Sequence, residues 1–284
     1  MFWHIRGQKL FFEKTLLMGV LNLTPDSFSD GGKYLDAEAA FERAVRLVEE
    51  GADILDLGAE STRPGALAIG IEEESDRLIP ILKKIRLNFD IPLSIDTTKP
   101  EIARRALGEG ANIINDVSGL QGGQSRELAE IAKNFGAGLV LMHRRGNPGT
   151  MQQMTVYSNV VRDIQSELEE SLKAAYAAGL RREQLVIDPG LGFAKTAEQN
   201  FEIIQNLERF QSFGVPVMLG PSRKAFLGQV TGRPVNAREF GTAAVAAIAV
   251  MKGVQILRVH EVGAIRDAVR TAEAIRGEGH HVRT

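Results

Sequence analysis

The chain has 284 residues, of which 44% are hydrophobic and 25% charged, and its formal net charge at pH 7 is −2. This near-neutral charge gives no electrostatic reason to expect a nucleic-acid or anionic-membrane partner. Cysteine is absent, which excludes disulfides, thiolate metal sites and a cysteine nucleophile. The N-terminal residues lack the apolar stretch of a signal peptide, and the longest apolar run, 243–251, is too short to span a bilayer. We therefore expect a cytoplasmic protein.

Residues 1–14 predict a small hairpin around Gly7 that caps one end of the main fold. From there on, short apolar runs that end in polar clusters alternate with segments of helical periodicity. The runs span 15–22, 54–63, 92–98, 112–119, 138–145, 185–190, 216–224 and 256–261. Helices are expected over 36–50, 71–87, 100–109, 125–135, 158–178, 197–210, 237–252 and 261–276, with a further helix starting after Ser222-Arg223-Lys224.

This alternation predicts a closed (β/α)8 barrel, the TIM barrel, over residues 15–277, within one domain of 1–284 whose last residues, 278–284, form a tail. The run ends recur every 34 residues or so, roughly the length of a strand–helix–strand unit. A doubly wound open sheet is the alternative, but it predicts one dominant nucleotide loop, which the sequence lacks. The carboxyl ends of all barrel strands meet at one rim, so the polar run ends should line one pocket.

Several familiar catalytic motifs are incomplete. The Gly32-Lys33 pair follows Ser27 where a Walker loop needs a glycine, GLGFAK (190–195) lacks the last glycine of a dinucleotide fingerprint, and GPSRK (220–224) lacks that of a nucleophile elbow. These gaps argue against nucleotide hydrolysis, hydride transfer and serine hydrolysis.

The run ends instead indicate a site for a flat heterocycle. Asp96 and Asp188 end apolar strands, where an unpaired carboxylate would be costly. A carboxylate can accept two parallel N–H bonds from an amidine-like ligand edge, although an ion pair with Lys or Arg in the barrel mouth is the alternative. Asn115 can donate and accept at once, which suits ring nitrogens, or it can form a turn at the strand end.

Basic residues at other run ends indicate an anion beside that heterocycle. Arg63, Arg258 and His260 can supply positive charge to a phosphate leaving group, with a salt bridge at the rim as the alternative for Arg258. Ser222 stands at the start of a predicted helix, where free backbone N–H groups favour an anion.

Two loops, 23–33 and 58–70, are rich in Gly, Pro, Ser and Asp, and each follows a strand. They are therefore predicted to overhang the rim as lids. Phe28 and Phe193 suit either core packing or a ligand platform. His143 is more typical of a hydrogen-bonded structural histidine than of a catalytic one.

Eight segments carry a resemblance that covers nearly the whole chain. In order they are MGVLNLTPDSFSDGG (18–32), DLGAESTRPGA (56–66), SIDTTKP (94–100), NIINDVSG (112–119), LMHRRGNPGTMQ (141–152), DPGLGFAK (188–195), SRKAFLG (222–228) and RVHEV (258–262). Together they resemble the dihydropteroate synthase family of pterin-binding barrels. The resemblance implies a transferase of folate biosynthesis that joins 6-hydroxymethyl-7,8-dihydropterin diphosphate to p-aminobenzoate and releases pyrophosphate. It also implies a homodimer and a sulfonamide target.

The resemblance further implies roles for individual residues. The pterin would contact Asp96, Asn115, Met142, Asp188, Phe193 and Lys224, the diphosphate Asn22, Thr62, Arg63, Arg258 and His260, and p-aminobenzoate Phe28, Pro64 and Ser222. Asn22 would also be the protein ligand of a Mg²⁺ that arrives with the diphosphate. Asp30, Arg63 and Lys224 would act in catalysis, Asp30 by stabilising a methylene cation.

The sequence departs from the family pattern at three places. Ala59 and Ala194 stand where the family more often has glycine, and Arg144-Arg145 is more basic than the usual pair. None of these positions is a proposed ligand. The nearest alternative function is a methyltetrahydrofolate-dependent methyltransferase, which uses the same barrel and pterin cluster but needs no diphosphate site. A catalytically silent pterin-binding protein is a further alternative, and it predicts that the diphosphate site is broken.

Overall fold

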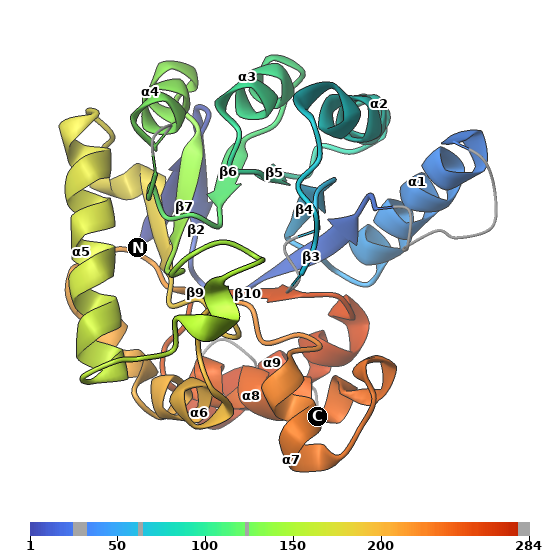
Figure 1. Cartoon of the computed structure of the whole chain (residues 1–284). Coiled ribbons are helices and arrows are strands. Elements are labelled where there is room, and N and C mark those ends of the chain that lie inside the picture. The colour runs from blue at the N-terminus through green and yellow to red at the C-terminus, as the bar shows by residue number, and fades with distance from the viewer. Residues whose placement is uncertain (25–32, 62–64, 123–124, 278–284) are drawn as a thin grey trace.

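A computed structural model describes residues 1–24, 33–61, 65–122 and 125–277 of the chain. Parallel strands form a central barrel, and helices surround it (Figure 1). The barrel strands are β3 (Leu16–Asn22), β4 (Ile54–Gly58), β5 (Leu93–Asp96), β6 (Ile113–Asp116), β7 (Gly138–Met142), β8 (Leu185–Asp188), β9 (Met218–Leu219) and β10 (Ile256–Val259). Their order around the sheet is β8-β7-β6-β5-β4-β3-β10-β9. A parallel bridge between Ile187 and Val217 joins the two ends. The predicted closed barrel is therefore confirmed over an open sheet.

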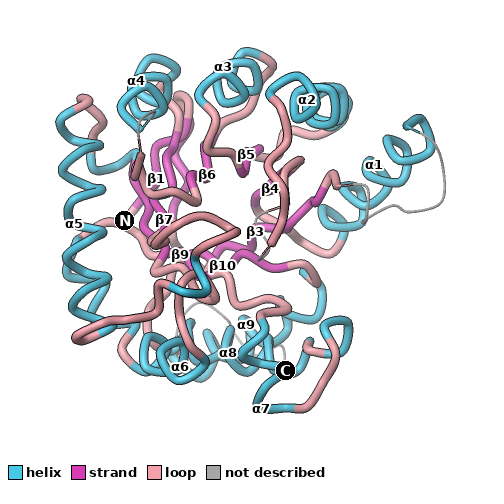
Figure 2. Tube along the Cα trace, viewed as in Figure 1, coloured by secondary structure: helices cyan, strands magenta, loops and turns pink. Residues whose placement is uncertain are grey.

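Helices follow the strands and cover the outside of the barrel (Figure 2). They are α1 (Lys33–Glu49), α2 (Ile71–Asn88), α3 (Pro100–Gly108), α4 (Ser125–Phe135), α5 (Val160–Ala177), α6 (Ala197–Gln205), α7 (Ala225–Thr231), α8 (Glu239–Met251) and α9 (Val262–Arg276). The expected boundaries agree closely, except that α1 begins three residues early and α6 gives way to a 3-10 helix, Leu207–Phe213. Local sequence explains several starts, such as the Thr196–Gln199 capping box of α6. No helix in the described ranges is long and apolar enough to cross a membrane.

The predicted N-terminal hairpin closes the amino end of the barrel. Strands β1 (Phe2–Ile5) and β2 (Gln8–Phe11) pair antiparallel, and Arg6 and Gly7 turn the chain with φ of 44° and 81°. Trp3 and Ile5 are fully buried in an inner cluster with side chains from the start of the barrel strands. The indole of Trp3 donates to the carbonyl of Gln184 at 2.9 Å. With this end plugged, the carboxyl ends of the strands are left for a site.

Replacing Trp3 with alanine should lower the free energy of unfolding by about 3–5 kcal/mol, because a large buried side chain is removed from a packed cluster. Phe11→Ala on the same hairpin is the matched control, since Phe11 is 56% exposed. Urea unfolding followed by circular dichroism measures both. Equal losses in the two variants would contradict the plug role of Trp3.

Candidate active site

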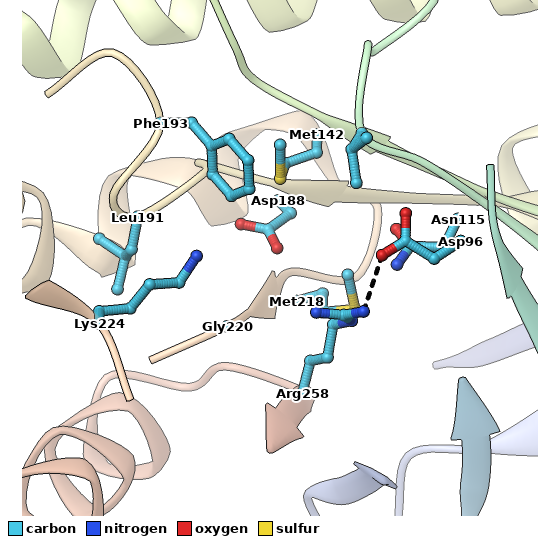
Figure 3. A pocket seen from close by; sticks show the side chains of 11 residues that line it. Asp96, Asn115, Met142, Asp188, Leu191, Phe193, Met218, Gly220, Lys224 and Arg258 are labelled. Carbon is cyan, nitrogen blue, oxygen red and sulfur yellow. Dashed lines mark hydrogen bonds and ion pairs between the residues drawn. The ribbon is translucent and has the colours of Figure 1, made fainter. Parts of the chain in front are cut away.

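A hollow of about 340 Å³ lies among residues at the carboxyl ends of the barrel strands. It is lined by Asp96, Asn115, Val117, Met142, Asp188, Leu191, Phe193, Met218, Gly220, Lys224 and Arg258 (Figure 3). These residues come from β5 through β10 and from the loops that follow β6, β8 and β9. Seven of the candidate residues named above line the hollow, and six of these come from six different apolar runs, which confirms that distant run ends share one pocket.

One side of the hollow carries Asp188 and Lys224. Asp188 ends β8, and its Oδ1 accepts the backbone N–H of Gly190 at 2.7 Å. Burial raises the pKa of the Asp188 carboxyl. Lys224 caps α7 and places its ammonium 4.3 Å from the ring centre of Phe193. Burial lowers the pKa of Lys224 to about 8. A carboxylate and a cation under an aromatic ring suit a flat polar ligand.

The opposite side carries an ion-pair cluster around Arg258. The guanidinium donates to Asp96 Oδ2 at 2.8 Å and to Asp56 Oδ2 at 2.6 Å (Figure 3 marks the first). Although burial opposes it, the two carboxylates raise the pKa of Arg258. The ion pair considered as the alternative for Asp96 and Arg258 is thus present in this structure. It neutralises charges that would be costly if buried alone.

Asn115 supplies an unused acceptor. Its Nδ2 donates to Asp56 Oδ2 at 3.2 Å, while its buried Oδ1 has no hydrogen-bond partner in the described part of the chain. A buried carbonyl without a donor costs about 1–3 kcal/mol. Because Asn115 lines the hollow, an N–H group on a bound ring would satisfy that oxygen.

Asp96 makes stability depend on pH. Burial, with the nearby negative charge of Asp56, raises the pKa of Asp96 from 3.8 to about 7 despite Arg258. Between these two pH values the folded state binds more protons at Asp96 than the unfolded state does, so the free energy of unfolding falls as pH rises.

Asp96→Asn should therefore show a shallower fall in unfolding free energy between about pH 4 and pH 7 than the wild type. Urea unfolding across this range measures the difference. Asp76→Asn, an exposed carboxylate on α2, is the control and should keep the wild-type slope. The attribution to Asp96 fails if Asp96→Asn also keeps that slope.

The residues expected at the diphosphate and p-aminobenzoate are only partly described. Asn22 ends β3, and Ser222 and His260 lie together, since Ser222 Oγ accepts the backbone N–H of His260 at 3.2 Å and lies 2.9 Å from its Nδ1. Asn22, Ser222 and His260 do not line the hollow itself. Phe28, Asp30, Thr62, Arg63 and Pro64, which belong to the two predicted lids, lie outside the described residues.

Sequence reasoning missed some members of this site. Asp56 is fully buried and bonds both Arg258 and Asn115. In the sequence, Asp56 differs from the predicted site residues because it is a single carboxylate in the middle of an apolar strand and not at the end of one. Leu191 and Met218 line the hollow but have the apolar character of any core residue, so nothing in the sequence marked them. His143, in contrast, is buried and hydrogen-bonded to Glu167 and Lys195, which confirms its predicted structural role.

Comparison with known proteins agrees with this geometry. The family model described as pterin binding enzyme matches residues 18–260. The dihydropteroate synthase of Synechocystis is 42% identical over 272 residues, which cover 95% of this chain and 93% of that protein. The chain belongs to the dihydropteroate synthase family. It is therefore a transferase, and the family expected from its sequence motifs is confirmed.

Solved structures of the family show the same fold. The Yersinia pestis dihydropteroate synthase, in a complex with a sulfonamide drug, superposes with a TM-score of 0.90 at 36% identity and covers 98% of this chain and 100% of its own. The Thermus thermophilus enzyme, in a complex with 4-aminobenzoate, gives 0.86 at 40% identity and covers 97% and 100%. Identity at this level over almost the whole length confirms the TIM barrel.

Proposed function

We propose that the hollow binds the pterin of 6-hydroxymethyl-7,8-dihydropterin diphosphate and that the chain joins it to p-aminobenzoate, forming 7,8-dihydropteroate and pyrophosphate. The observation that carries the proposal is the unpartnered Asn115 Oδ1 in a buried hollow that also holds Asp188 and Lys224. Asn115 Oδ1 and the Asp188 carboxylate can accept hydrogen bonds, and Lys224 can donate one. A ring with alternating N–H, N and C=O groups requires such a set of partners.

The pterin roles implied by the family resemblance are supported by the place of each side chain in the lining of the hollow. Asp188 would accept N–H bonds from the aminopyrimidine edge, where a charged acceptor makes the strongest hydrogen bonds. Asn115 and Asp96 would complete the ring contacts from the opposite side, and Lys224 would donate to the ring carbonyl. Met142 and Phe193 would wall the flat faces of the ring.

The diphosphate would lie beyond the pterin, at Asn22, Thr62, Arg63, Arg258 and His260. The amide oxygen of Asn22 is a ligand of the kind that Mg²⁺ accepts, and the described residues contain no group of three or more acidic, His or Cys side chains that could hold a metal alone. A Mg²⁺ here would thus depend on substrate phosphate oxygens, which fits an ion carried in by the diphosphate. When bound, it supplies positive charge to the departing pyrophosphate.

The reaction is a dissociative substitution. The bond between the methylene carbon and the diphosphate oxygen breaks, and its electron pair leaves with pyrophosphate, whose charge Arg63 and Arg258 would stabilise. The electron-rich pterin, held by Lys224, and the carboxylate of Asp30 stabilise the methylene cation. The amine of p-aminobenzoate, seated by Phe28, Pro64 and Ser222, then forms the new C–N bond and releases a proton.

Pyrophosphate release tests this function. We expect release when pterin diphosphate, p-aminobenzoate and Mg²⁺ are all present, and none when either organic substrate is omitted. Methyl transfer from methyltetrahydrofolate with no pyrophosphate release would favour the methyltransferase alternative. Pterin binding without any turnover would favour a silent pterin-binding protein.

The expected homodimer rests on the family resemblance alone, and the expected cytoplasmic location rests on the sequence, in which no signal-like or membrane-spanning stretch was found. A homodimer is expected in the cytoplasm, and light scattering on the purified chain measures the assembly. A mass of 31.0 kDa, that of one chain, would contradict the dimer.

A further inference from the structure

A buried lysine, Lys195, is the last residue of the loop that follows β8, residues 189–195. The side chain of Lys195 is 4% exposed, and it is not among the residues that line the hollow. Its Nζ is 2.9 Å from each of three acceptors: His143 Nδ1 and the carbonyl oxygens of Gly190 and Phe193. An ammonium group has three N–H donors, so these contacts use all of them. Lys195 thus links two points of the loop to the residue that follows β7.

The partner of Lys195 has a defined protonation state. Because the lysine donates to His143 Nδ1, the ring proton must be on Nε2, which lies 3.0 Å from Glu167 Oε2 and donates to it. Burial and the charge of Lys195 lower the pKa of His143 to about 4, so the imidazole is neutral at pH 7. The neutral ring therefore links Lys195 to Glu167 on α5.

A second set of contacts leads from Glu167 back to the same loop. Glu167 accepts from Arg145 Nε at 3.0 Å, and the Arg145 guanidinium lies 3.8 Å from the ring centre of Tyr157. The Tyr157 hydroxyl donates to the carbonyl of Ala194 at 3.1 Å. Ala194 has φ of 51°, a left-handed conformation that is unfavourable for a residue with a Cβ. The loop is therefore held at neighbouring residues from two directions.

This loop shapes the hollow. It carries Leu191 and Phe193, which line the hollow, and it starts directly after Asp188. It also lies against the backbone just after β7, because a Cβ at Gly190 would be 2.0 Å from the carbonyl oxygen of His143. A small shift of the loop would therefore move both an aromatic wall and the neighbourhood of the central carboxylate.

We propose that Lys195, His143 and Glu167 are positioning residues that fix loop 189–195 in the shape that binds pterin. The inference rests on the proposed pterin site and adds residues that touch no substrate. Loss of these contacts should weaken pterin binding. The loop would then be ordered only when pterin binds, and the free energy needed to order it would be subtracted from the binding free energy. It should leave the Michaelis constant for p-aminobenzoate unchanged, since none of the three residues is assigned to that substrate.

Two substitutions at one position test the proposal. His143→Gln keeps both links, because the amide oxygen accepts from Lys195 and the amide N–H donates to Glu167, whereas His143→Leu removes both. Binding of 6-hydroxymethylpterin is measured by calorimetry at pH 6. Burial lowers the pKa of Lys195 to about 7, so the lysine is still charged at this pH. We expect His143→Leu to raise the dissociation constant about tenfold to a hundredfold, as for other misplaced site elements. His143→Gln should stay close to the wild type.

Further measurements keep the proposal testable if His143→Leu does not fold. Lys195→Met should raise the KM for pterin diphosphate with little change in kcat, and Lys173→Met, whose side chain is 59% exposed, is its control. Nitrogen NMR of the wild type should show His143 protonated on Nε2 only. The proposal is overturned if folded His143→Leu binds pterin as the wild type does, or if the His143 proton lies on Nδ1. A wild type that binds no pterin would instead overturn the proposed function.

Discussion

Asp188→Asn should weaken binding of 6-hydroxymethylpterin about a hundredfold, which corresponds to about 3 kcal/mol. The asparagine oxygen can still accept the N–H of Gly190, so the loop keeps its hydrogen bond at the end of β8. The substitution removes the charged acceptor that faces the ligand. The new NH₂ group instead places N–H donors opposite the N–H donors of the pterin. Calorimetry with the wild type and the variant measures the two dissociation constants.

A second effect of this substitution must be separated from the first. The charge of Asp188 raises the pKa of Lys224 and so offsets part of the lowering by burial. Without that charge, Lys224 loses its proton at a lower pH, and its donor to the ring weakens. Repeating the titration at pH 6 keeps Lys224 protonated and isolates the carboxylate. Asp76→Asn on the surface of α2 is the matched control. If Asp188→Asn and this control bind pterin with equal affinity at pH 6, the role of Asp188 as a pterin acceptor is contradicted.

Arg258→Met should lower kcat by about a hundredfold to a thousandfold, the usual cost of one group that stabilises developing negative charge. It should also lower the free energy of unfolding by about 3 kcal/mol or more, because Asp56 and Asp96 would remain buried without their cation. Pyrophosphate release and urea unfolding measure the two effects on the same preparation.

Arg258→Lys separates charge from geometry. The guanidinium reaches Asp56 through Nε and Asp96 through Nη2, and a single ammonium cannot reproduce this fork. We therefore expect a kcat between those of the wild type and Arg258→Met, with a smaller loss of stability. A folded Arg258→Met variant with wild-type kcat would show that Arg258 serves the cluster of carboxylates and not the leaving group.

The side of the site proposed for pterin could largely be predicted, because its residues stand at the ends of apolar runs. Asp96, Asn115 and Asp188 are polar residues where a strand stops, and barrel topology brings such positions to one rim. Asp56 could not be found this way. It lies within β4, and only the inward turn of its side chain places it beneath Asn115 and Arg258.

Local pattern in the sequence determined the alternation of strands and helices, the N-terminal hairpin and the set of run ends, because these depend on hydrophobic period and turn residues within a few positions. Only the tertiary structure decided which charges meet. Arg258 pairs with Asp56 and Asp96, more than a hundred residues away in sequence, and Lys195 joins His143 to a loop that lies beyond α5. Such pairings depend on the direction of each side chain at the carboxyl end of the closed barrel and on its burial. These two features set the hydrogen bonds and pKa values, and a local sequence pattern records neither.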